Sequence, residues 1–149
     1  MIFYCNSAVS DATKWEIWSD GTIINPRSGL VLTGSKDSSG MINLIVDSNS
    51  YGSRQAWYVS NNTNPSVTTI VGYNGECLLA SGTLVWLERC LSNDAEQQWA
   101  IYLDGTIRPQ KNRLGCLKYT DEILVTVGTA MDGMRNGGDF IAMAPFSMR

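Results

Sequence analysis

The sequence repeats itself with a period of 42 residues. Trp15, Trp57 and Trp99 stand 42 positions apart, and the last two close the same Gln-x-Trp motif, at residues 55–57 and 97–99. The nine residues from Trp15, WEIWSDGTI, match the nine from Trp99, WAIYLDGTI, at six positions. A fixed period of a few tens of residues indicates repeated units that bury their apolar faces only against one another. The sequence therefore predicts an array of similar lobes.

The composition is compatible with a folded core and argues against nucleic-acid binding and a membrane span. Of the 149 residues, 44% are hydrophobic, which is enough for a core in one domain or in parts of two small ones. The net charge of −3 argues against binding to nucleic acid, whose phosphates require Lys and Arg. No run of about 18 apolar residues is present, so we expect no membrane span. The first five residues, MIFYC, do not have the pattern of a signal peptide.

The spacing of turn residues predicts an all-β chain. Asp20-Gly21 and Asp104-Gly105 each separate an aromatic residue from Thr-Ile, which is a strong hairpin signal. No window of about eleven residues has helical periodicity, although residues 94–98 could form one helical turn. Short runs rich in Val, Ile and Leu lie between the turns and are typical of strands, at residues 30–32, 42–46, 68–71, 84–87 and 123–127.

Histidine is absent, and this removes the usual general base and the commonest metal ligand. The four cysteines lack the C-x-x-C spacing of zinc sites, so we expect no metal and no other cofactor. Cys77 and Cys90 flank a stretch that turns once, at Ser81-Gly82. Two strands folded back there could bring the two sulfurs into bridging range, and two buried thiols are the alternative. A disulfide would indicate the secretory pathway.

Residues 61–66 form a polar, turn-rich segment with one proline and are predicted to be a linker. Asn61 begins the sequon Asn-Asn-Thr, a candidate N-glycosylation site in an exposed loop of a secreted glycoprotein. The periodic pattern breaks in the tail. Near residue 141, where the next Trp is due, the chain reads Asp-Phe-Ile and lacks both Gln and Trp.

Lobes of about 40 residues that end in Gln-x-Trp and carry an Asp-Gly hairpin resemble the ricin-type lectin β-trefoil. The narrower resemblance is to the B chain of plant type 2 ribosome-inactivating proteins. It covers about residues 1–127 and fades in the last 22. The stretches that carry it are residues 11–28, 61–63, 67–72 and 95–110.

The resemblance implies a division of the chain between two trefoil domains. Residues 1–59 would be the end of the first domain, residues 60–66 the linker and residues 67–149 the start of the second, with an irregular tail after about residue 127. Cys77 and Cys90 match both members of a lobe's disulfide. Cys5 and Cys116 each match a cysteine whose partner in the family is missing, so we expect them not to pair with one another.

The resemblance also implies a lectin chain of the galactose or N-acetylgalactosamine class, which is not an enzyme. Its partners would be galactose-type sugars or glycoconjugates, bound weakly, and a ribosome-inactivating A chain. The expected location is the secretory pathway, with the protein extracellular or in a plant vacuole or seed. In a binding lobe of this family, an aspartate lies two residues past the lobe's first cysteine or its apolar equivalent. Here Thr33, Leu79 and Lys118 occupy the matching positions.

The other pocket positions are also altered, and we expect degenerate sugar sites. In the lobe ending at Trp57, Ile45 and Arg54 stand at two of these positions, and Asp47 takes the place of the stacking ring. In the lobe ending at Trp99, Glu88 stands where a ring is expected. A core role, with hydrogen bonds to the backbone, is the alternative for both Gln-x-Trp glutamines, and a buried position is the alternative for Trp86. The candidate sugar-binding residues are Asp47, Gln55, Trp86, Glu88 and Gln97.

Three other interpretations compete with that of a lectin. The chain could be a non-binding structural segment of the trefoil that packs against a partner chain. A trefoil protease inhibitor is disfavoured because such inhibitors lack the 42-residue Trp period. An enzyme would have to use carboxylate pairs, Asp94 with Glu96 or Asp121 with Glu122, which more plausibly cover exposed loops.

Overall fold

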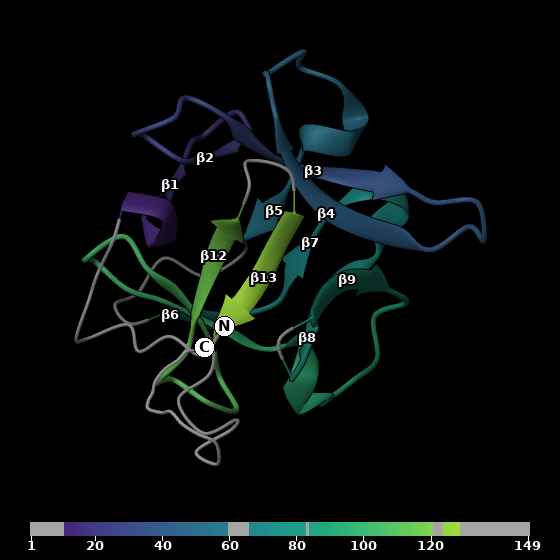
Figure 1. Ribbon diagram of the computed structural model, residues 1–149. Coiled ribbons are helices and arrows are strands. Elements are labelled where there is room, and N and C mark those ends of the chain that lie inside the picture. The colour runs from purple at the N-terminus through teal and green to yellow at the C-terminus, as the bar shows by residue number, and fades with distance from the viewer. Residues whose placement is uncertain (1–10, 60–65, 83, 121–123, 129–149) are drawn as a thin grey trace.

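The computed structural model describes residues 11–59, 66–82, 84–120 and 124–128, and these residues form an all-β fold, as predicted (Figure 1). The helical elements among them are single 3-10 turns. Their bounds are η1 (Asp11–Thr13), η2 (Ser53–Gln55), η3 (Tyr73–Gly75) and η4 (Ala95–Gln97). The turn η4 coincides with the helical turn predicted at residues 94–98, and the Asp94 side chain caps it by accepting a hydrogen bond from the Glu96 N–H. No helix in the described ranges has the length and apolar character needed to cross a membrane.

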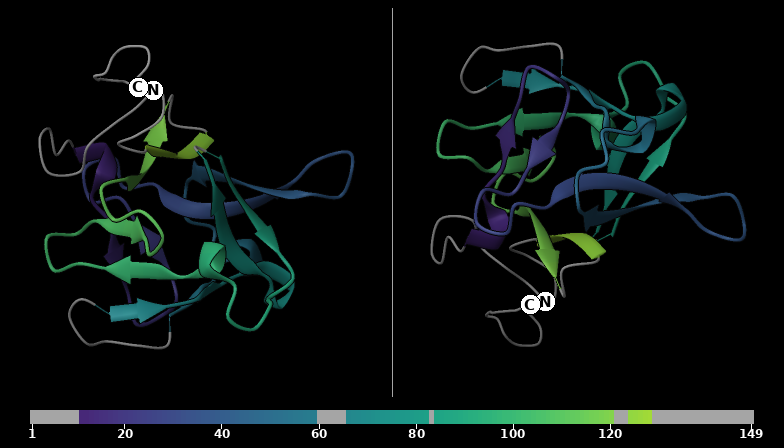
Figure 2. Two further views of the ribbon diagram at one scale, coloured as in Figure 1. Left: turned by 90° about the horizontal axis from the view of Figure 1, so that it is seen from below. Right: turned by 90° about the horizontal axis from the view of Figure 1, so that it is seen from above.

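Three antiparallel hairpins, one from each lobe, come together along their edges. Strand β4 pairs with β9 of the second hairpin and with β13 of the third, and β9 also contacts β13. In Figure 2 the turn of the first hairpin, in blue, projects away from the other strands. The hairpins are β3 (Val31–Lys36) with β4 (Ile42–Asp47), β8 (Cys77–Ser81) with β9 (Leu84–Glu88), and β12 (Cys116–Thr120) with β13 (Leu124–Gly128).

The remaining strands are shorter, and three of them begin at or next to the periodic tryptophans. Strand β1 pairs with β2, β5 with β7, and β10 with both β11 and β6, all antiparallel. Their bounds are β1 (Glu16–Ile17), β2 (Ile23–Ile24), β5 (Tyr58–Val59), β6 (Ser66–Thr68), β7 (Ile70–Val71), β10 (Trp99–Ile101) and β11 (Ile107–Pro109).

The two predicted Asp-Gly turns form hairpins with the same internal bonds. Gly21 and Gly105 have φ values of 96° and 93°, a backbone conformation that glycine adopts without steric cost. The Asp104 carboxylate accepts hydrogen bonds from the backbone N–H and the hydroxyl of Thr106, and Asp20 accepts the same pair from the following Thr. Each turn is therefore fixed by its own aspartate.

The three tryptophans occupy equivalent, buried positions, as the period predicted. Their exposed fractions are 4% for Trp15, 7% for Trp57 and 0% for Trp99. Each indole Nε1–H donates to the carbonyl of the second residue of a hairpin. The three bonds are Trp57 to Leu32 at 2.9 Å, Trp99 to Leu78 at 2.8 Å and Trp15 to Leu117 at 3.0 Å. The same hydrogen bond therefore occurs once in each of three equivalent lobes, and an assembly of three such lobes is a β-trefoil.

The third lobe is built from two distant parts of the chain. Trp15 completes the hairpin β12–β13, which begins about a hundred residues later, and its ring meets that of Tyr119 edge-on at 6.4 Å. The predicted linker at residues 60–66 therefore joins two segments that share one hydrophobic core, with residues from Trp15 to Leu117 in the same cluster. The assignment of residues 1–59 and 67–149 to two different domains stays a prediction about a longer protein.

Cys77 and Cys90 form the predicted disulfide, with an S–S distance of 2.00 Å. The disulfide ties the first residue of β8 to the segment that follows β9. Cys116 is buried and is also disulfide-bonded, so the expectation that this cysteine has lost its partner is wrong. Cys5 lies outside the described residues, as do Asn61 and the tail after residue 128.

Candidate functional site

The three positions that correspond to the sugar-binding aspartate of a lectin lobe are equivalent in the fold. Thr33, Leu79 and Lys118 are each the third residue of the first strand of a hairpin. Across the hairpins they pair with Ile45, Trp86 and Thr126. The expected carboxylate is thus replaced by a hydroxyl, an isobutyl group and an ammonium at three matching places.

In the first lobe, the side-chain amide of the candidate residue Gln55 is already hydrogen-bonded to other groups of the protein. Its side chain is 4% exposed, and its Nε2 donates to Thr33 Oγ1 at 3.2 Å and to the Ser48 carbonyl at 2.8 Å. Its Oε1 accepts the backbone N–H of Ser50 at 2.7 Å. Asp47 is exposed, and its carboxylate accepts the N–H of the next residue. The amide of Gln55 therefore closes a loop of its own lobe.

Arg54 in the same lobe turns toward the neighbouring one. Its guanidinium carbon lies 4.6 Å from the centre of the Tyr73 ring, in a cation–π contact between η2 and η3. A residue at a predicted pocket position thus takes part in packing between lobes.

In the second lobe, Gln97 has the same role as Gln55. It is fully buried, its Oε1 accepts the Leu91 N–H at 2.9 Å, and its Nε2 donates to the Arg89 carbonyl at 2.9 Å. Leu79 is 4% exposed and lies opposite Trp86, while Glu88 is exposed and pairs across the hairpin with Cys77. Apolar groups therefore occupy the positions of this lobe where a polar pair would bind a sugar.

Trp86 is half-buried at the contact of the first two hairpins. It pairs with Leu79 on β8 and with Asn43 on β4. Its indole Nε1 is buried and has no hydrogen-bond partner in the described part of the chain. Trp86 is thus flanked by two strands, and a role for it in sugar binding stays a prediction.

The third lobe places a cation where the family has an anion. Lys118 is partly buried, and burial lowers the pKa of its ammonium because desolvation penalises the charged form. A positive charge at this position cannot accept hydrogen bonds from sugar hydroxyls. Lys118 itself therefore does not supply the acceptor that galactose binding needs.

We expect Gln97→Ala to destabilise the fold by about 1–3 kcal/mol, because it removes a buried amide and leaves the partly buried Leu91 N–H and Arg89 carbonyl without their partner. Urea unfolding measures the loss. Gln98→Ala is the matched control, since the half-buried side chain of Gln98 makes no hydrogen bond within the described residues. Equal stability of the two variants would contradict a structural role for Gln97.

A buried arginine stabilises the second Asp-Gly turn, and the sequence analysis missed it. Arg108 is 5% exposed and donates to Asp104 Oδ2 at 3.1 Å and to Thr106 Oγ1 at 2.9 Å. Its guanidinium also lies 4.2 Å from the centre of the Tyr102 ring. Burial alone would raise the pKa of Asp104, but hydrogen bonds from Thr106 and the charge of Arg108 together hold the pKa below its ordinary value.

Asp104→Asn is therefore expected to lower stability near neutral pH by about 1 kcal/mol, a value limited by solvent screening at this half-exposed carboxylate. A carboxyl whose pKa is lowered by folding stabilises the protein above its unfolded pKa, and that contribution is lost as the pH falls through the folded value. The difference from wild type should thus shrink below about pH 4. Asp20→Asn, in the equivalent turn, is the control, and a loss that does not depend on pH would contradict the role of the charge.

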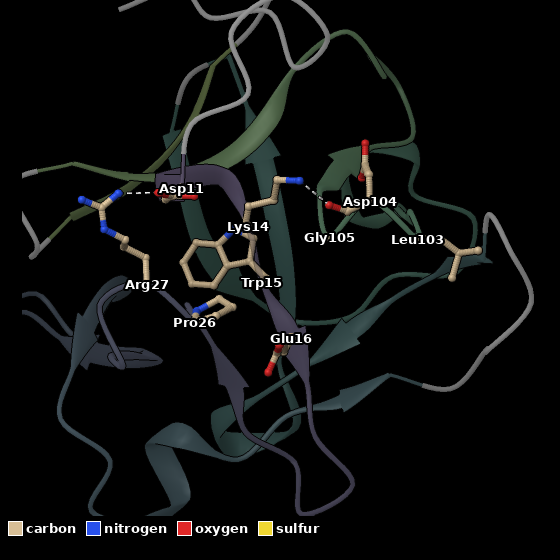
Figure 3. A pocket seen from close by; sticks show the side chains of 9 residues that line it. All are labelled: Asp11, Lys14, Trp15, Glu16, Pro26, Arg27, Leu103, Asp104 and Gly105. Atoms are coloured by element: carbon tan, nitrogen blue, oxygen red, sulfur yellow. Dashed lines mark hydrogen bonds and ion pairs between the residues drawn. The ribbon is translucent and has the colours of Figure 1, made fainter.

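Where the third lobe closes, the fold forms a pocket of about 620 Å³, which we call the junction pocket (Figure 3). Sequence analysis could not locate it, because its two walls come from segments that are about 80 residues apart. Its lining residues are Asp11, Lys14, Trp15, Glu16, Pro26, Arg27, Leu103, Asp104 and Gly105.

The described residues include some of the acidic groups considered from sequence. No group of three or more His, Cys, Asp or Glu side chains that could hold a metal occurs among them. Of the carboxylate pairs considered from sequence, Asp94 serves as the cap of η4, and Asp121 and Glu122 lie outside the described ranges.

Sequence comparison relates the chain to agglutinins, abrin and a lectin of plants. It is 50% identical over 141 residues to an agglutinin of Ricinus communis, a match covering 91% of this chain and 25% of that protein. It is 51% identical over 121 residues to abrin-a of Abrus precatorius, covering 81% and 23%. A beta-galactoside-specific lectin of Viscum album is 46% identical over 127 residues, covering 85% and 22%. The chain thus spans about a quarter of the length of these relatives.

No family model matches the chain. Among solved structures, a designed threefold-symmetric protein, ThreeFoil, is similar, with a TM-score of 0.55 and 17% identity over 72% of this chain and 86% of that one. At this identity the similarity shows the fold alone, and it agrees with the three equivalent lobes.

Proposed function

This chain belongs, as a segment of their lectin region, to the type 2 ribosome-inactivating proteins and related lectins, and we propose that it is a carbohydrate-binding module of the galactose class with degenerate lobe pockets. The identity of about 50% to relatives that include a beta-galactoside-specific lectin carries the proposal. The chain itself performs no catalysis in this proposal.

The geometry of the lobes supports the degeneracy. A sugar on a shallow site depends on a few hydrogen bonds, and each lost charge-assisted bond costs roughly 1.5–3 kcal/mol. Thr33, Leu79 and Lys118 remove the carboxylate from all three lobes, and the amides of Gln55 and Gln97 are already occupied. Binding at about millimolar affinity amounts to only ~4 kcal/mol, so little would survive at these pockets.

A second candidate function is a structural segment that packs against a partner chain. The burial of Leu79 and the backbone bonds of both glutamines favour it, because they show pocket positions used for packing. An A chain of the ribosome-inactivating type is the partner that we would test first. The Cys77–Cys90 disulfide supports a secretory location, extracellular or in a vacuole or seed, where glycosylation at Asn61 would also be possible.

Titration of galactose and N-acetylgalactosamine into the ¹⁵N-labelled chain tests the proposal. We expect saturable chemical-shift changes with an overall dissociation constant weaker than about 1 mM. At Thr33, Leu79 and Lys118 we expect no binding in the millimolar range. Tighter binding at those positions would contradict the degeneracy of the pockets. The absence of saturable shifts with either sugar would contradict the carbohydrate-binding function and favour the structural segment.

A further inference from the structure

We propose that the junction pocket is a carbohydrate site of its own, which takes one neutral sugar residue and does not depend on the three lobe pockets. This inference rests on the proposed function, since it names the place where the chain would still bind a sugar. The pocket's volume of about 620 Å³ lies within the range of about 300–1,000 Å³ that is typical of small-molecule sites.

The two walls of the pocket are fixed before any ligand arrives. The Trp15 N–H donates to the Gly105 carbonyl at 2.8 Å, and Lys14 Nζ donates to the Asp104 carbonyl at 2.7 Å, so the first wall is bonded to the β10–β11 turn. The buried Asn25 amide donates to the carbonyls of Asp11 and Lys14 at 2.7 and 2.9 Å. These bonds hold the pocket in one shape, which lowers the entropic cost of binding.

Apolar groups lie on both walls. Figure 3 shows the Pro26 ring beside the indole of Trp15, with the side chain of Leu103 on the opposite wall. Leu103 is 85% exposed, so its side chain is open to a ligand in the pocket. Trp15 is only 4% exposed, so Pro26 and Leu103 are the apolar side chains that could contact the C–H-rich face of a sugar ring.

The charges that line the pocket nearly cancel. Asp11 forms an ion pair with Arg27, and Asp104 is paired with Arg108 beneath the turn. Glu16 and Lys14 then contribute one charge of each sign. The five charged lining residues sum to −1, and Arg108 outside the lining offsets this charge through its ion pair with Asp104. The pocket therefore has little reason to select an anion or a cation, whereas its carboxylates and amines can accept from and donate to hydroxyl groups. This favours a neutral polyhydroxyl ligand.

The equivalent junction elsewhere in the trefoil lacks these groups. Trp57 donates its N–H to the Gly21 carbonyl at 2.8 Å, as Trp15 does to Gly105. At that junction, however, Ala56 stands at the position of Lys14, and Ser19 stands at the position of Leu103. The pocket chemistry is therefore a property of the Trp15 junction and not a consequence of the repeat.

The test is a ¹⁵N NMR titration of the full chain with galactose, N-acetylgalactosamine, glucose and, as a charged probe, glucuronate. Saturable shifts are expected at the Trp15 indole N–H and at the amides of Glu16 and Leu103. Leu103→Ala and Lys14→Met should each weaken the neutral sugar by about fivefold or more. Ser19→Ala is the matched control at the equivalent turn and should leave the affinity unchanged. Dispersed spectra of all three variants verify that they fold.

Chemical-shift changes confined to the lobe positions would overturn the junction pocket. An affinity that Leu103→Ala leaves unchanged would overturn it too. Carbohydrate binding itself would stand in both cases. Tighter binding of glucuronate than of galactose would overturn the choice of a neutral ligand. Absence of saturable shifts with all of the sugars would overturn the pocket and the proposed function together.

Discussion

Trp99→Ala is expected to lower the free energy of unfolding by about 3–5 kcal/mol, a large share of the stability of a domain of this size. The Trp99 side chain is fully buried, and its indole donates to the Leu78 carbonyl at 2.8 Å. Alanine would leave a cavity at the centre of the core and a carbonyl without its partner. Urea unfolding followed by circular dichroism measures the difference between variant and wild type.

Trp18→Ala provides the matched control. Trp18 is 50% exposed, and its indole bonds only to Glu16 two residues away, so its replacement should cost less than about 1 kcal/mol. A comparable loss in the two variants would contradict the assignment of the periodic tryptophans to the core.

Removing the Cys77–Cys90 disulfide with the double variant Cys77→Ala, Cys90→Ser is expected to destabilise the protein by about 3 kcal/mol. The two residues are separated by 13 positions, and in the chain-entropy model closing a loop of about this length restricts the unfolded chain by that amount. The variant leaves the bonded Cys116 intact, which a reducing agent would not. Urea unfolding again measures the change.

Either single variant also breaks the disulfide, so Cys90→Ser alone should lose nearly as much stability as the double variant. Cys77 is 1% exposed and Cys90 is exposed, so the loss of packing alone should be small at Cys90. If the double variant unfolds at the same urea concentration as wild type, the disulfide does not contribute to stability, and the loop-closure argument is wrong.

The sequence predicted the lobes well because their signals are local. The Asp-Gly turns bind their own Thr side chains, and the 42-residue period identified the three buried tryptophans. The turns are decided within about ten residues, and the period can be read directly along the sequence. The disulfide could be predicted for the same reason, since Cys77 and Cys90 lie on a single hairpin.

The closure of the fold could not be predicted, because it depends on contacts between distant segments. The bond from Trp15 to the Leu117 carbonyl joins the third lobe across most of the described chain. A period shows that lobes are similar but does not show which ones share a core. The resemblance instead suggested two domains, and that division stays a prediction. It also left Cys116 without a partner, which the structure corrects.

The candidate site was predicted in position but only partly in role. The three positions that replace the aspartate are equivalent in the fold, as the lobe alignment required. Gln55 and Gln97 bond to backbone groups, as the core role offered from the sequence predicted, although no sequence pattern gives the course of the loops they bond to. The junction pocket and the buried Arg108 were missed for a similar reason, since their neighbours are fixed only when the lobes assemble.

A crystal structure of the chain soaked in galactose tests most directly the claim that this is one trefoil with degenerate lobe pockets. We predict the three indole N–H bonds to Leu32, Leu78 and Leu117, no sugar density at the lobe pockets, and any ordered sugar in the junction pocket. Galactose bound beside Thr33 or Lys118, or Trp15 bonded away from Leu117, would contradict the account.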